Sequence, residues 1–508
     1  MRLLILLVFL GGLMSVARAQ LTQADVQLII NQASSRATAL GATSAVIAVT
    51  TREGEVLGVW SVNGTTPSSV IIGAAVSKAG TASFLSSNQN AFTSRTAAYI
   101  TQQNFPPGII NRPQGALVGI GLSSLPQSDA NRFRAPPFNT SFSIGNPVLN
   151  SSLTISPGGL PLYKNNILVG GIGVSGVQTE LTTYVPGYFT SEDIAVAGQT
   201  GFAPAAGILA TGVFLDGIRL PYVESSTSLG TVSQIGADVA PYTVQAAPTP
   251  TPWPQVTLGG VAGQYRRRDY ADPNPADPSP IADPIVTNTP NVPASARLTK
   301  NEVIQILTQG AQRAVITRSG IRQPLSSPSA LYVVVVNNPD NTNGNYNTDP
   351  TLTPRILGIF RMNDTINDAF DVAPQKTRSA LFFSNSSFAF GSRTIGFLAQ
   401  SYFPPGINST GPGPFQGLQS LVSNPASTTP FDYYLRNGLT IFAGAVPLYR
   451  NGVLIGAVGA SGDGVDQDDL VAAAASVGFV APTNIRADQF SFNNARLPYV
   501  KFPRQPVR

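Results

Sequence analysis

The chain has 508 residues, enough for two domains that each bury their own core. Charged residues make up only 11% of the sequence and the net charge is +5. The only basic run, Arg266 to Arg268, is followed by Asp269, so the chain lacks the concentrated basic face of a nucleic-acid-binding protein. It contains no histidine and no cysteine. That excludes disulfides, Ser-His-Asp and Cys-His catalysis, His- or Cys-ligated zinc, and haem iron held by imidazole or thiolate.

The first 19 residues have the pattern of a secretory signal peptide. Arg2 precedes an apolar run from Leu3 to Leu13, and small residues around Ala19 precede Gln20. A membrane anchor is the alternative, but the run is shorter than the roughly 20 residues that span a bilayer, and no later segment spans one. We therefore expect cleavage near Ala19-Gln20 and a secreted or periplasmic protein without a transmembrane segment.

The remaining sequence is an internal duplication, with one copy in residues 20–239 and the other in residues 297–508. Each copy begins with apolar residues at helical spacing, and Thr22 is placed to cap the first of these helices. Two β-prone runs follow in each copy: 45–49 and 56–60 in the first, 331–336 and 356–360 in the second. They predict a pair of adjacent strands in each domain.

A second helical stretch begins near Lys78 in the first copy and near Lys376 in the second. Further along, Arg95 and Arg393 open two more matched segments that end in Phe-Pro-Pro-Gly, which stops a helix. Lys78 and Lys376 are separated by the same number of residues as Arg95 and Arg393, so the two copies align here without a gap. We expect Arg95 and Arg393 to cap or bridge helices.

The most similar stretches of the two copies are residues 161–176 and 447–462. Asn451-Gly452 lies between two apolar, β-prone runs and predicts a two-residue turn with positive φ angles, and therefore a β-hairpin. Asn165-Asn166 predicts the same turn in the first copy. A helix is expected after each hairpin.

Residues 240–296, between the copies, are rich in Pro, Thr, Asp and Ala. This composition predicts an extended, semi-rigid linker that does not pack against a core. It could serve as a spacer that lets two similar domains pair, or it could be a remnant of the duplication.

Lys78-Ala-Gly-Thr-Ala82, the hairpin at 447–462 and the following Asp466-Gln-Asp-Asp469 resemble the GlcG/HbpS haem-binding family, and the resemblance extends over both copies. It implies an α/β (α+β) fold of two similar domains, each with a central antiparallel sheet flanked by helices. It also implies homo-oligomers, and haem or a related tetrapyrrole as ligand. We further expect intramolecular pairing of the two domains. The chain departs from the family pattern at Thr377, and by an inserted loop before Ser191 in the first copy.

Without histidine, a haem site needs tyrosine, a hydroxyl, a carboxylate or apolar contacts alone. Tyr163 and Tyr449 occupy matched positions beside a cation, where a tyrosinate can ligate ferric iron. The alternative is a half-buried strand tyrosine. Lys78 and Lys376 are candidates to pair with a ligand carboxylate, or are surface lysines with extended side chains.

Gly171 to Gly176 spells the GxGxxG dinucleotide fingerprint, but it follows a hairpin late in its domain and Ala457 replaces the first glycine in the second copy. Close packing explains the glycines better. A second interpretation is that backbone amides before a helix hold an anion such as a propionate or phosphate. The residues of this candidate site are Ser175, Gly176, Ser461 and Gly462.

Acidic residues gather at 463–469, where they suit a helix start. Calcium is the alternative, because clustered carboxylates provide its preferred oxygen ligands, although the spacing does not fit an EF-hand. The Asn-rich loop 337–349 is a second calcium candidate or a solvated insertion.

The sequence favours an exported tandem-domain binding protein for haem or a related tetrapyrrole. The alternative is a non-catalytic structural or surface-assembly protein that keeps the fold without the ligand. Catalysis ranks third, because no carboxylate paired with Lys or Tyr recurs at a suggestive position in both copies.

Overall fold

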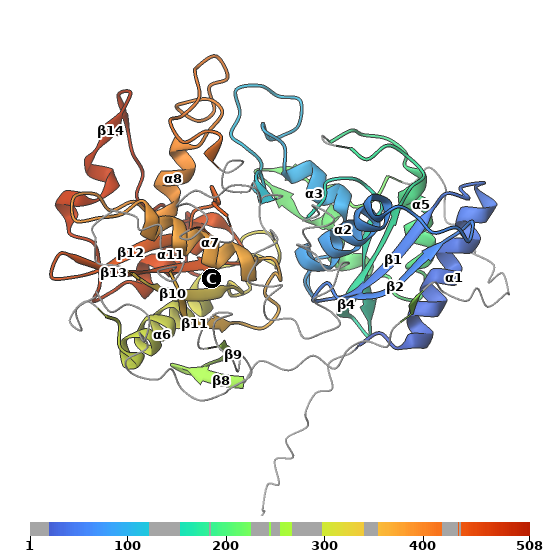
Figure 1. The fold of residues 1–508 in the computed structure, drawn as a ribbon, viewed down its shortest axis with the longest axis horizontal. Helices are drawn as coiled ribbons and strands as arrows, with labels where there is room; N and C mark the ends of the chain where they lie inside the picture. The colour runs from blue at the N-terminus through green and yellow to red at the C-terminus, as the bar shows by residue number, and fades with distance from the viewer. Residues whose placement is uncertain are drawn as a thin grey trace, which may run out of the picture.

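The computed structural model describes residues 20–120, 153–181, 184–224, 243–244, 255–266, 297–339, 354–418, 435 and 438–508. The expected signal peptide, residues 1–19, and most of the Asn-rich loop lie outside them. Two domains with the same order of elements follow each other along the chain (Figure 1). No helix in the described part is long and apolar enough to cross a membrane.

The first domain is built on an antiparallel sheet with strand order β3-β4-β1-β2-β7. Its strands are β1 (Val46–Thr51), β2 (Val56–Ser61), β3 (Gly159–Lys164), β4 (Ile167–Ser175) and β7 (Thr243–Val244). Its helices are α1 (Gln23–Ala39), α2 (Ser69–Leu85), α3 (Ser94–Ile100) and α5 (Thr190–Gly198). A small hairpin, β5 (Phe214–Leu215) and β6 (Ile218–Arg219), follows.

The second domain repeats this plan with strand order β12-β13-β10-β11-β9-β8. Its strands are β8 (Gln255–Leu258), β9 (Val261–Arg266), β10 (Tyr332–Asn337), β11 (Ile356–Arg361), β12 (Ala445–Arg450) and β13 (Val453–Ser461). Its helices are α6 (Lys300–Ile316), α7 (Ala369–Phe382), α8 (Ser392–Leu398) and α11 (Val465–Ala475). The small hairpin here is β14 (Ser491–Phe492) with β15 (Ala495–Arg496).

Helices cover both faces of each sheet. In β1, Ile47 and Val49 join the core formed with α1 and α5, whereas Val46 and Ala48 pack with Ile72 and its neighbours on α2. This alternation follows from the two-residue period of a strand. In the second domain α7 takes the place of α2, and α6 and α11 take the places of α1 and α5. The predicted fold class is confirmed.

The two hairpins turn where the sequence predicted. Asn165 and Asn166 have φ angles of 53° and 61°, and Asn451 and Gly452 have 52° and 79°. Asn and Gly tolerate this left-handed region better than other residues, which explains their presence here.

The glycines of the rejected dinucleotide fingerprint let α2 approach β4 closely. A Cβ atom on Gly171 or Gly173 would lie 2.1 Å from the carbonyl oxygen of Ala79 or Ala75, both on α2. The close-packing interpretation is therefore confirmed for these positions.

The linker prediction was wrong for part of the segment. β7 pairs with β2, and the β8–β9 hairpin adds to β11 at the edge of the second sheet. Leu258 and Val261 are buried there. A strand at the edge of a sheet has unpaired N–H and C=O groups, and the backbone of a Pro-rich connection can form hydrogen bonds with them.

Candidate functional site

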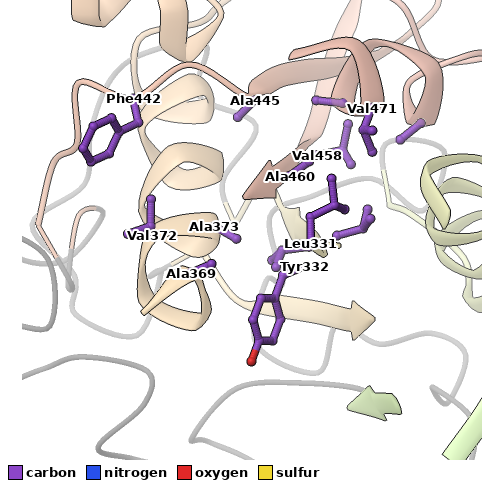
Figure 2. Packing of buried hydrophobic residues seen from close by; sticks show 14 of the residues in the cluster. Leu331, Tyr332, Ala369, Val372, Ala373, Phe442, Ala445, Val458, Ala460 and Val471 are labelled. Atoms are coloured by element: carbon purple, nitrogen blue, oxygen red, sulfur yellow. The ribbon is translucent and has the colours of Figure 1, made fainter. Parts of the chain in front are cut away.

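A cavity of about 900 Å³ lies between the two domains, within the size range of small-molecule sites. Apolar side chains from both domains line it. Those of the first domain include Leu85, Phe92, Ile100, Leu117, Ile120 and Leu215. Those of the second are Ile321, Ile366, Val372, Phe442 and Phe502. Figure 2 shows Val372 and Phe442 on the side of α7 away from the sheet residues Val458 and Ala460, and all four belong to one cluster of buried residues.

The lysine predicted on α7 reaches this cavity, but it is not a surface lysine. Lys376 is only 1% exposed, and its Nζ donates to the carbonyl oxygen of Ala460 at 3.1 Å and to Asp468 Oδ2 at 2.7 Å. Burial raises the pKa of the Asp468 carboxyl to about 6, although the Lys376 ammonium opposes the shift. Both residues line the cavity. Sequence reasoning missed this pair because the two residues lie 92 positions apart.

Asp368, just before α7, is a second cavity carboxyl that sequence reasoning missed. It is 2% exposed, and its Oδ1 atom has no hydrogen-bond partner in the structure. Burial raises its pKa to about 7; Arg322 opposes this shift and Asp371 adds to it. The sequence carried a signal, because the matched position in the first copy is Val70.

Asp463 organises the loop after α6. Its carboxylate accepts a hydrogen bond from the Ser319 hydroxyl, from the Gly320 N–H at 3.1 Å and from the Arg322 N–H at 2.9 Å. Arg322 then donates from Nε to the Leu85 carbonyl oxygen at 2.9 Å, across to the first domain. The loop thus joins the cavity wall to the C-terminal end of α2.

The other acidic residues of the cluster also pair with groups of the chain. Arg393 binds Asp469 through Nε and Asp466 through Nη2, the latter at 2.6 Å, and Lys501 Nζ lies 3.0 Å from Asp466. Arg393 therefore bridges α8 and α11, as expected. Arg95 does the same between α3 and α5, where its Nη2 lies 2.8 Å from Glu192 Oε2.

The acidic residues do lie at a helix start, as expected, with Asp466 and Asp468 in the first turn of α11. The N-cap of α11, Gly464, makes no side-chain cap hydrogen bond. Within the described residues no group of three or more His, Cys, Asp or Glu side chains has an arrangement that could hold a metal ion.

The first domain uses its matched residues differently. Lys78 is 2% exposed; its Nζ donates to the Val174 carbonyl oxygen at 2.8 Å and lies 3.0 Å from Glu180 Oε1. Ser175 donates to the same Glu180 at 2.6 Å, and the Gly176 carbonyl accepts from Ser44 at 2.8 Å. Glu180 comes from the inserted loop. These partners are all within the first domain. Of the residues predicted for the haem and anion sites, Lys376, Ser461 and Gly462 line the cavity and the others do not.

The two candidate tyrosines lie away from the cavity lining. Tyr163 donates its hydroxyl to the Ser87 carbonyl oxygen at 2.6 Å, and Tyr449 donates to that of Asn385 at 2.8 Å. Burial raises the pKa of both hydroxyls well above the usual range. Each is thus held as a neutral donor in its own domain, and this arrangement opposes the tyrosinate form that ligates iron.

A family model described as "Haem degrading protein HbpS-like" matches residues 21–183 and 354–476, more than half of the chain. The chain belongs to this HbpS-like family. No curated protein sequence matches it significantly.

Solved structures similar to this HbpS-like chain are 18–20% identical to it over the parts that align. Protein ORFY of Klebsiella pneumoniae is 20% identical over 37% of this chain and 93% of its own, with a TM-score of 0.23. PduOC, in a complex with haem, is 20% identical over 37% and 98%, with a TM-score of 0.21. A double mutant of Streptomyces reticuli HbpS is 18% identical over 40% and 99%, with a TM-score of 0.22.

Proposed function

We propose that this chain binds haem or a related tetrapyrrole in the cavity between its two domains. The observation that carries the proposal is the lining: apolar side chains of both domains line one cavity whose volume is within the range of small-molecule sites. Lys501 and Arg504 stand exposed at its margin, where they can pair with the carboxylate groups of a tetrapyrrole. The HbpS-like family and the haem complex of PduOC support the same ligand class.

The ligand ratio follows from the position of the cavity. The cavity is lined by both domains and contains the lysine of the second domain, Lys376, but not Lys78 of the first. We therefore propose one ligand per chain. The residues that hold it are the apolar wall, with Lys376, Asp368 and Asp468 facing one part of the ring.

The proposal includes pairing of the two domains within one chain. Arg322 donates to Leu85, and Asn111 and Asn408 exchange two hydrogen bonds of 2.9 Å between backbone N–H and side-chain oxygen. The reciprocal asparagine pair is the pattern of a pseudo-twofold contact. Assembly into homo-oligomers stays a prediction.

Export is a further part of the proposal, supported by the N-terminal pattern of residues 1–19. Mass spectrometry of the chain recovered from the medium or the periplasm should show Gln20 as its first residue. An intact Met1 terminus on a cell-retained chain would contradict export.

The test of binding is an absorption titration of the chain from Gln20 with ferric haem. We expect a saturable Soret shift at one haem per chain. Ala116 lines the cavity and is half-buried, so Ala116→Trp should fill the site and abolish the shift. Ala206→Trp, at an exposed position outside the lining, is the matched control and should leave the shift unchanged.

The Tyr163→Phe, Tyr449→Phe double variant belongs in the same titration. Because both hydroxyls are tied to carbonyl oxygens, the shift should persist in this variant. Its loss would assign the iron to the tyrosines. If the unaltered chain shows no saturable shift, the structural or surface-assembly function takes first place. If Ala116→Trp leaves the shift intact, haem binds outside the cavity and the proposed site is wrong.

A further inference from the structure

Two buried acceptor oxygens of the cavity lining have no hydrogen-bond partner in the structure. They are Oδ1 of Asp368 and Oδ1 of Asp468, in residues that are 2% and 3% exposed. The other oxygen of Asp468 is bound by Lys376 at 2.7 Å. A buried acceptor without a donor is unfavourable, and native proteins rarely keep one without a reason. Two such oxygens in one cavity indicate a ligand that brings donors.

The neighbouring cations do not supply these donors. The guanidinium of Arg322 donates hydrogen bonds to the carbonyl oxygens of Leu85, Ser86 and Asp364. Lys376 directs its ammonium to Asp468 Oδ2 and to the Ala460 carbonyl oxygen. The other cations of the lining, Arg318, Arg393, Lys501 and Arg504, donate to neither of the two oxygens, so a bound molecule can bring the missing donors.

Tetrapyrroles differ in this respect. In haem all four pyrrole nitrogens bind the iron, so the centre of the ring presents no N–H group. A metal-free porphyrin or an open-chain tetrapyrrole keeps pyrrole N–H groups that a carboxylate can accept. The cavity also lacks the imidazole and thiolate ligands that usually hold haem iron, because the chain has no histidine or cysteine.

We infer that the cavity selects a metal-free tetrapyrrole, with Asp368 and Asp468 accepting hydrogen bonds from its pyrrole N–H groups. This inference rests on the proposed function, which it narrows from tetrapyrroles in general to those that carry N–H donors. Lys376 acts as a positioning residue, because it fixes Asp468 through Oδ2 and leaves Oδ1 without a donor. A site that hydrogen-bonds an N–H group discriminates strongly against an analogue that lacks it.

The test compares three probes on the chain from Gln20 at one pH: ferric haem, protoporphyrin IX and biliverdin. Dissociation constants come from absorption titration for all three and from fluorescence for the porphyrin. We expect at least one metal-free probe to bind about tenfold or more tighter than haem. The porphyrin and biliverdin arms show whether the ring is closed or open.

Asp368→Leu removes one acceptor without breaking an ion pair, and so keeps the chain folded. It should weaken the metal-free ligand about tenfold while changing the haem affinity by less than about twofold. Asp488→Leu, in an ion pair with Arg486 outside the lining, is the control and should change neither affinity.

Two results would overturn the inference and leave the proposed function standing. Haem could bind as tightly as both metal-free probes, or Asp368→Leu could weaken all three probes equally. Failure of all three probes to bind saturably would overturn the inference and the proposed function together.

Discussion

The two domains place a buried lysine at the same point but pair it with different acids. Lys78 of α2 and Lys376 of α7 donate to matched carbonyl oxygens at the ends of β4 and β13. In the first domain the carboxylate is Glu180, on an inserted loop, with 38% of its side chain exposed. In the second it is Asp468, on α11, with 4% exposed.

This difference shows that the fold fixes the lysine, whereas the partner decides what the lysine can do. Water can reach Glu180, and Lys78 together with the Ser156 and Ser175 hydroxyls outweighs burial and lowers the pKa of that carboxyl. Asp468 is enclosed at the cavity, and burial raises its pKa. The first pair therefore satisfies a buried ammonium with an acid that water can reach, while the second leaves one oxygen of a buried carboxylate without a hydrogen-bond partner.

Removal of each lysine is expected to give the largest difference in stability between the two domains. Lys376→Met leaves Asp468 buried without its counter-ion, so we expect a loss of about 3–5 kcal/mol in the free energy of unfolding. Lys78→Met leaves a carboxylate that water can solvate, and the expected loss is below about 1 kcal/mol from that ion pair. Urea unfolding followed by circular dichroism at pH 7 measures both.

A double variant controls for the loss of the lysine side chain itself. Lys376→Met with Asp468→Leu removes both charges and should recover most of the stability, because an apolar pair can replace a buried ion pair. Equal losses in the two single lysine variants would show that the exposure of the acid does not matter.

The sequence predicted the parts of this site that depend on local patterning. The Asn451-Gly452 turn and the shared offset of Lys78 and Lys376 gave the hairpins and the matched helices. The sequence did not predict which carboxylate pairs with each lysine. Neither an insertion nor a helix start specifies which distant side chain it will meet, and Arg322 reaches Leu85 across 237 positions. The linker strands were missed because composition does not reveal an available sheet edge.

Asp368 is a second difference between the two domains, because the first domain has Val70 at the matched position. The folded pKa of Asp368 is raised to about 7, against about 3.9 for an unfolded chain. Between these values the folded state binds more protons than the unfolded state, so stability from this group is present at low pH and lost as pH rises from about 4 to about 7. Asp368→Asn should remove that loss, on the order of 2–4 kcal/mol.

Urea unfolding at pH 5 and pH 8 measures this effect, and the variant should exceed the parent in stability mainly at pH 8. Asp488 is a control whose pKa shifts in the opposite direction, because the effect of Arg486 outweighs that of burial and lowers the pKa of Asp488. Asp488→Asn should cost less than about 1 kcal/mol, with the loss present at pH 8 and smaller at acidic pH. A parent chain that gains stability from pH 5 to pH 8 relative to Asp368→Asn would contradict the assignment.

The smallest expected difference concerns how closely each helix lies on its sheet. A Cβ on Gly173 would lie 2.1 Å from the Ala75 carbonyl oxygen and 2.5 Å from the Ala79 nitrogen, which are backbone atoms. A Cβ on Gly459 would lie 2.1 Å from the Thr377 hydroxyl but 3.1 Å from the nearest backbone atom, the Ala373 carbonyl oxygen. Because a side chain yields more easily than a helix backbone, Gly173→Ala should cost about 2–3 kcal/mol and Gly459→Ala about 1 kcal/mol.

Thermal or urea unfolding of the two variants gives this difference directly. Adding Thr377→Ala, which restores the residue that the first copy carries at Ala79, should relieve the Gly459→Ala variant by removing the hydroxyl in the way. If Gly459→Ala costs as much as Gly173→Ala and Thr377→Ala brings no relief, then α7 lies as rigidly on its sheet as α2. The second domain would then have no more freedom than the first to adjust α7, the helix that carries Lys376 to the cavity.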